Sequence, residues 1–90
     1  MNKVRRKSLK EVQSKIEELQ AGIADILEML DSIRDEEEEY RDSIPENLQF
    51  SEKYEKSDEA VDAITSAYDA VEEADGSLSE AIDYIEDAIQ

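Results

Sequence analysis

Apolar residues recur with a seven-residue period in the second half of the chain, from residue 60 to the C-terminus. Apolar spacings of three and four residues place one continuous stripe along a helix. A sustained seven-residue period indicates that this stripe faces another helix. Alanine occupies every seventh position, at Ala60, Ala67, Ala74, Ala81 and Ala88. The larger apolar positions are Val61, Ile64, Tyr68, Val71, Leu78, Ile82 and Ile85.

The first half of the chain has a pattern of the same kind. Its apolar residues alternate in steps of three and four, and the phase continues to Tyr40 and Ile44 with Glu37 as one polar interruption. We therefore expect a first helix from about residue 8 to residue 42. Its apolar positions are Leu9, Val12, Ile16, Leu19, Ile23, Ile26, Leu30 and Ile33.

A turn is predicted at about residues 43–51. Pro45 disfavours a helical conformation at the residue before it and can open a new helical turn. Ser51 and Ser57 are both candidate N-caps for the second helix, which we expect at about residues 52–89.

Local signals at Gly76 conflict with the heptad phase. Gly76 is a candidate C-cap, and Ser77 with Glu80 forms a capping box, so these residues favour an end and a new start. The apolar positions nevertheless keep their register across Gly76, which a loop has no reason to preserve. We expect one continuous or gently kinked helix, with a break at Gly76 as the alternative.

The two apolar stripes match when the chain folds back on itself. In an antiparallel pair of helices, the numbers of two facing residues have a constant sum. A sum of 94 places nearly every apolar residue of the first helix opposite an apolar residue of the second, and each such pair is called a layer. The same register places Arg34 near Asp58. The exceptions are Glu37 opposite Ser57 and Leu19 opposite Asp75. We predict an all-α fold with a single domain over residues 1–90, an antiparallel two-helix hairpin of the coiled-coil type.

A two-helix hairpin of this size buries side chains only along one line of contact between its helices, called the seam below. Such a hairpin is marginally stable alone. The alanine row forms a second surface beside that seam, and Leu27 and Met29 flank the seam on the first helix. We therefore expect a homo-oligomer, most simply a dimer that forms a four-helix bundle.

Charge is distributed unevenly along the chain. The net charge is −16, residues 1–15 hold six Lys or Arg and one acid, and residues 57–90 hold no Lys or Arg. The hairpin would place the basic N-terminal segment beside the acidic C-terminal one, where each supplies the counter-charge that the other lacks. So negative a surface opposes direct binding to nucleic acid or anionic lipid and leaves basic protein partners open.

Composition also limits the kinds of reaction and metal site that the chain can support. The chain has no Cys and no His, which argues against an enzyme and against a transition-metal site or cofactor. No apolar run reaches the length of a membrane span, and the basic N-terminus lacks the apolar core of a signal peptide. We expect a cytoplasmic protein.

The few cations indicate where a ligand would bind. One cluster lies near the predicted turn and combines cations with aromatic rings, a pairing that suits a phosphate joined to a stacked ring. It comprises Arg34, Tyr40, Arg41, Phe50, Lys53, Tyr54 and Lys56. A second candidate is the basic N-terminal group, Arg5, Arg6, Lys7 and Lys10. The alternative is that these cations form ordinary salt bridges with the many nearby acids.

The acids of the second helix permit another interpretation. They lack the spacing of a calcium loop, but Asp62, Asp69 and Asp83 recur on one helical face. Regularly spaced carboxylates on a rod resemble a nucleic-acid backbone, whereas a charged outer face is also what a soluble coiled coil needs.

The turn region resembles small acidic helical-hairpin proteins encoded by phages and prophages of low-GC Gram-positive bacteria. The resemblance rests on residues 36–40, 42–49 and 51–56 and on the alanine-rich heptads. It implies a counter-defence protein in the bacterial host cytoplasm. Some small helical phage proteins sequester nucleotide immune signals, and others inhibit host nucleases.

These observations lead to three hypotheses. The first is a non-catalytic, homo-oligomeric binding protein that sequesters a small phosphate-bearing, nucleotide-type signal or a host factor. The second is an acidic nucleic-acid mimic that inhibits a host DNA- or RNA-binding enzyme, of the anti-restriction or anti-CRISPR type. The third is a structural coiled-coil adaptor.

Overall fold

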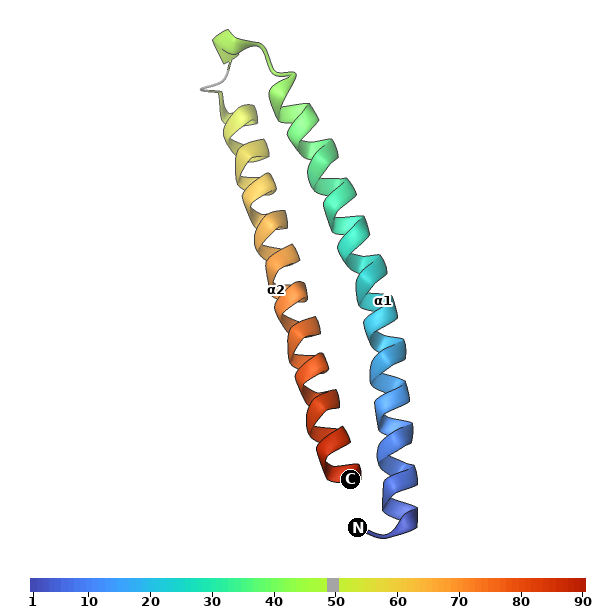
Figure 1. The fold of residues 1–90 in the computed structure, drawn as a ribbon. Helices are drawn as coiled ribbons and strands as arrows, with labels where there is room; N and C mark the ends of the chain where they lie inside the picture. The colour runs from blue at the N-terminus through green and yellow to red at the C-terminus, as the bar shows by residue number, and fades with distance from the viewer. Residues whose placement is uncertain (49–50) are drawn as a thin grey trace.

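The protein is two long helices joined by a short turn (Figure 1). The computed structural model describes residues 1–48 and 51–90. Helix α1 spans Lys3–Asp42, the 3₁₀ turn η1 spans Glu46–Leu48, and helix α2 spans Glu52–Ile89. The prediction of an all-α chain whose two helices pack against each other is confirmed.

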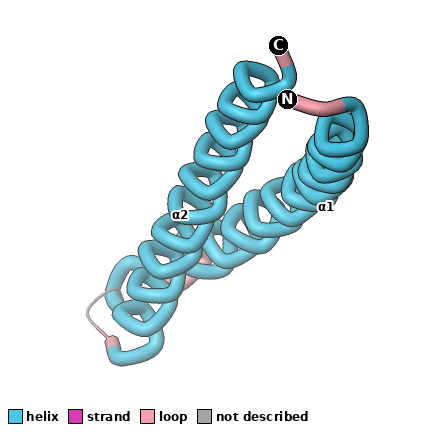
Figure 2. The backbone as a smooth tube through the Cα atoms, turned by 90° about the horizontal axis from the view of Figure 1, so that it is seen from below, coloured by secondary structure: helices cyan, strands magenta, loops and turns pink. Residues whose placement is uncertain are grey.

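The two helices run antiparallel and side by side, so both termini lie at the same end of the molecule (Figure 1). Figure 2, seen from below, shows that they form a single pair with no further layer among the described residues. The molecule measures 69 × 16 × 13 Å along its principal axes. An elongated shape of this kind leaves most side chains in contact with solvent.

Helix α1 begins earlier than residue 8 because Asn2 caps it. The Asn2 side chain accepts a hydrogen bond from the backbone N–H of Arg5 at 2.8 Å, which satisfies one of the free donors of the first turn. At the other end, the backbone N–H of Ser43 donates to the Glu39 carbonyl at 3.0 Å, and the Ser43 hydroxyl donates to the Tyr40 carbonyl at 2.8 Å. These bonds close the last turn.

The connection between the helices is held by local hydrogen bonds. The backbone N–H of Leu48 donates to the Pro45 carbonyl at 2.8 Å and forms the 3₁₀ turn. The Ser51 side chain then accepts from the backbone N–H of Tyr54 at 3.3 Å. Of the two candidate N-caps, Ser51 is therefore the one that starts α2.

Helix α2 runs through Gly76 without interruption. Neither glycine of the chain has a positive φ angle, so Gly76 does not adopt the left-handed conformation of a C-cap. The heptad phase, rather than the local capping signals, describes this segment. Leu78 and Ile82 beyond Gly76 are half-buried like Val71 before it, so packing against α1 continues on both sides of the glycine.

The seam on α1 differs from the predicted one in one of its two rows. The central row was predicted and is present: Leu9, Ile16, Ile23, Leu30, Glu37 and Ile44 are buried or half-buried. The second row at the seam is the inner row, which is half-buried and consists of Gln13, Gln20, Leu27, Arg34 and Arg41. The row predicted there, called the outer row below, is exposed and consists of Val12, Leu19, Ile26, Ile33 and Tyr40.

The seam on α2 follows the predicted stripe. Its large apolar residues from Val61 to Ile85 are buried or half-buried. The core is nevertheless thin, because only three apolar residues in the described part of the chain are classed as buried, namely Ile23, Ile44 and Val61. A single seam between two helices leaves every large side chain in residues 1–48 and 51–90 partly exposed.

Candidate binding surfaces

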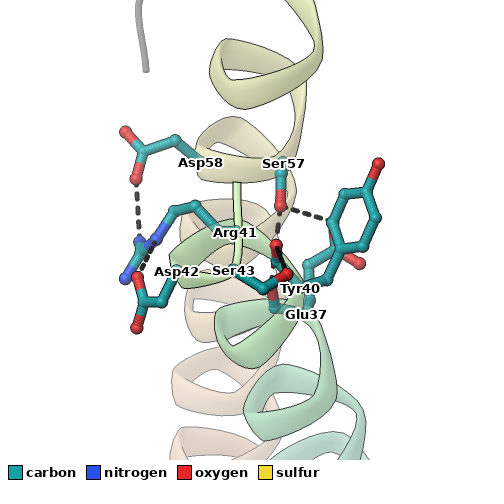
Figure 3. Close-up of polar contacts among 7 residues, drawn as sticks. All are labelled: Glu37, Tyr40, Arg41, Asp42, Ser43, Ser57 and Asp58. Atoms are coloured by element: carbon teal, nitrogen blue, oxygen red, sulfur yellow. Dashed lines mark hydrogen bonds and ion pairs between the residues drawn. The ribbon is translucent and has the colours of Figure 1, made fainter. Parts of the chain in front are cut away.

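Arg41 forms the main ionic contact at the hairpin tip (Figure 3). Its guanidinium donates to Asp58 on α2 at 2.8 Å and to Asp42 at 3.2 Å. The hydrogen bonds that the Arg41 guanidinium donates to the Asp42 and Asp58 carboxylates raise its pKa, and the group stays charged at physiological pH. The prediction that Arg34 lies near Asp58 is wrong, because Arg41 occupies that place.

Glu37 and Ser57 form a polar layer within the seam. The Ser57 hydroxyl donates to the Glu37 carboxylate at 2.8 Å, and Ser57 is only 3% exposed (Figure 3). The predicted register placed these two residues opposite each other, and the contact confirms that layer. Their bond gives a carboxylate at an otherwise apolar position a hydrogen-bond donor.

The other described cations of the predicted tip cluster also have partners within the hairpin. The Arg34 guanidinium pairs with Asp31 and lies over the Tyr68 ring, 5.4 Å from its centroid. The Lys53 ammonium lies 5.5 Å from the centroid of the Tyr40 ring. These contacts fit the ordinary structural interpretation of the cations.

Three members of the tip cluster remain. Lys56 pairs with Glu52 at 3.0 Å on an exposed part of α2. Tyr54 is half-buried in the seam, and Phe50 lies outside the described residues. The structure therefore joins Lys53 with Tyr40 and Arg41 with α2, but it does not gather the cluster around one anion site.

The basic N-terminal group is arranged differently. Lys3, Arg6, Lys7 and Lys10 line an open hollow of about 480 Å³ together with Val4. Among residues 1–48 and 51–90, none of these cations lies within ion-pair distance of an acid.

Arg6 differs from its neighbours in this group. Its Nε atom is shielded from solvent without a hydrogen-bond partner, whereas Arg5 is exposed and does not line the hollow. The predicted group lacked Lys3 and Val4. The signal that could have included them is Asn2, whose capping preference extends the helix to this end of the chain.

The outer row makes an exposed apolar stripe along α1. Its five members are between 42% and 55% exposed, and neighbouring Met29 is 62% exposed. A shallow hollow of about 620 Å³ lies beside the middle of this stripe and is lined by Asp25, Glu28, Met29, Ser32 and Ile33. Large apolar side chains that recur at this density on one helical face are typical of an interaction surface.

The acids of α2 form the outward surface of that helix. Asp62, Asp69 and Asp83 are exposed, and they make no ion pair within the part of the chain that the structure describes. In the same part of the chain, no three acidic side chains converge in a way that would hold a metal ion.

Neither described helix has a stretch long and apolar enough to cross a membrane. Comparison of the chain with models of protein families, with curated proteins and with solved structures gave no match.

Proposed function

We propose that this chain is a non-catalytic binding protein that acts as a homo-oligomer and sequesters a small phosphate-bearing molecule. The supporting observation is the difference between its two groups of cations. The described tip cations are engaged within the hairpin, whereas Lys3, Arg6, Lys7 and Lys10 surround an open hollow without an acidic partner among the described residues.

The charge distribution favours a small anion over a polyanion. Lys and Arg side chains bind phosphate through charge-assisted hydrogen bonds, and the N-terminal group concentrates them at one end of the molecule. The rest of the chain brings the net charge to −16, which repels an extended nucleic acid. The resemblance of the turn region to phage hairpin proteins adds a nucleotide-type immune signal, or another host factor, as the proposed target.

Thermal unfolding with nucleotides tests this function. A ligand that binds only the folded state at about 100 times its Kd adds about 2.7 kcal/mol, which raises the Tm of a domain of this size by about 10–20 °C. We expect such a shift with a member of a panel of cyclic and ADP-ribose-type nucleotides at millimolar concentration.

Two matched variants locate the site. The double variant Arg6→Gln with Lys7→Gln is expected to abolish the shift, because it removes two cations from the hollow. Lys53→Gln with Lys56→Gln removes the same charge at the tip and is expected to keep the shift. The absence of a shift across the panel, or its loss only in the tip variant, would overturn the proposal.

The acidic face of α2 supports a second candidate, a nucleic-acid mimic that inhibits a basic host enzyme. A mimic would bind a basic nuclease with steep salt dependence. Replacing Asp62, Asp69 and Asp83 by Asn is expected to weaken that binding. Replacing three exposed acids of α1, Asp35→Asn, Glu36→Gln and Glu39→Gln, serves as the control. A structural adaptor, the third possibility, would show neither the nucleotide shift nor nuclease binding.

A further inference from the structure

The outer row and the alanine row lie on the same face of the hairpin. Lys53 precedes Ala60 by seven residues and therefore stands in line with the alanine row. Its ammonium lies over the ring of Tyr40, the last member of the outer row. The ion pair between Arg41 and Asp58 lies on the other side of the seam, as Figure 3 shows. The hairpin as a whole is therefore amphipathic, with one apolar face.

This apolar face consists of the outer row and Met29 on α1 and the alanine row on α2. The outer row extends from residue 12 to residue 40, which is about 42 Å at 1.5 Å per residue. Its strict seven-residue period fits a helix that runs alongside for that whole length. A second copy of the chain offers helices of matching length and period.

Charge determines how two copies would meet. Residues 1–15, which include the first turns of α1, hold six Lys or Arg and one acid, whereas residues 35–39 near the other end of α1 are five consecutive acids. Parallel packing of two α1 helices would place like charges together at both ends. Antiparallel packing sets the half of each α1 that carries the basic segment against the half of the other α1 that carries the acidic run, which is favourable for both copies.

We propose that a second copy of this chain packs on the apolar face, with the two α1 helices antiparallel, to form a four-helix bundle. When Ile26 faces the second copy's Met29, Gly22 faces its Ile33, and Lys15 lies within one turn of its Glu36. Gly22 has no neighbouring atom within 4 Å of a Cβ position in the hairpin, so the backbone is open to approach there. This inference rests on the homo-oligomeric part of the proposed function and is independent of the ligand.

Light scattering coupled to size exclusion tests the assembly. The wild-type chain is expected at twice its 10.3 kDa mass at micromolar concentration. Ile26→Glu places a charge in the centre of the apolar face and is expected to give a monomer. The hairpin should retain its helical circular dichroism, because Ile26 is already 46% exposed in it.

Ala21→Glu is the matched control. It adds the same charge at an exposed position of α1, about 140° around the helix from Ile26 at 100° per residue. This variant is expected to stay dimeric. A monomeric wild type, or an Ile26→Glu variant that keeps the wild-type mass, would refute the interface. If the wild type is monomeric but still binds a nucleotide, the proposed interface is wrong while the proposed ligand binding stands.

Cross-linking tests the orientation, because the chain has no native cysteine. A mixture of the Lys15→Cys and Glu36→Cys variants is expected to form covalent dimers with a short bis-maleimide. Each variant alone is expected to form few. Efficient cross-linking of Lys15→Cys with itself would show parallel packing and contradict the proposed arrangement.

Discussion

At the scale of single residues, the seam tolerates a carboxylate because a neighbouring hydroxyl meets it. Glu37 interrupts the apolar pattern of α1, and the heptad register placed it opposite Ser57. Ser57 is 3% exposed and donates to Glu37 at 2.8 Å. Sequence periodicity identified the pair of positions, but the hydrogen bond depends on rotamers that only the packed helices define.

The polar layer leads to a prediction for Ser57→Ala. The substitution removes the donor and leaves a half-buried carboxylate without it, so we expect a loss of about 1–2 kcal/mol in the free energy of unfolding. Chemical denaturation would measure this loss. In the double variant with Glu37→Leu, both polar groups are absent, and we expect stability to return to that of the wild type or above.

A double variant less stable than Ser57→Ala alone would contradict this account. Such a result would mean that the Glu37 carboxylate makes a favourable contact other than the one with Ser57. The cycle separates the two cases because each substitution removes one partner of the same bond.

At the scale of the helices, α1 carries more apolar rows than one partner helix can cover. Periodicity favoured the central and outer rows for the seam, because both are almost entirely apolar. In the structure α2 lies along the central and inner rows instead. The inner row contains polar residues that bridge to α2, such as Gln20, which donates to the Ser79 hydroxyl at 2.9 Å. The outer row is left exposed as a result.

The continuity of α2 leads to a prediction for Gly76→Ala. A Cβ at this position would meet no atom within 4 Å, and the helix passes through with ordinary backbone angles. Alanine is favoured over glycine inside a helix by about 1 kcal/mol. We therefore expect the Tm to rise by about 4–8 °C, measured by circular dichroism.

Ser77→Ala is a suitable control in the same helix, because Ser77 is exposed and already lies within the regular part of α2. A lower Tm for Gly76→Ala would mean that the helix bends or ends at Gly76 in solution, contrary to the structure.

At the scale of the whole molecule, strong charge is combined with a thin core. The net charge of −16 is spread over a rod that is only 16 × 13 Å across. The screening length is about 30 Å at 10 mM salt and about 3 Å at 1 M. At low salt, the many acids of the rod therefore repel one another. The described ion pairs are mostly exposed and offset little of this repulsion.

This balance predicts that salt stabilises the hairpin. We expect the Tm to rise between about 10 mM and 1 M sodium chloride, because screening weakens repulsion among acids more than it weakens the ion pairs. The Asp62→Asn, Asp69→Asn, Asp83→Asn variant lowers the net charge from −16 to −13 and should show a smaller rise. A Tm that falls with salt would indicate that ion pairs dominate.

By itself the sequence determined that the chain forms two long helices, where they turn, and that Glu37 meets Ser57 between them. Period, capping residues and charge are properties of the chain that act over a few neighbouring positions, so they can be read directly. Asn2 as the first cap was missed, because the basic run that follows it has Val4 as its only apolar residue before Leu9, and the apolar pattern used to place the helix starts later.

Only the tertiary structure decided which row of α1 faces α2 and which cations remain without a partner among the described residues. Burial of a row depends on where the other helix lies, and pairing of a cation depends on acids brought together from both helices. The tip cluster was predicted from proximity along the chain, and packing divided it into separate internal contacts. The outer row is exposed because α2 can cover only one line of contact along α1.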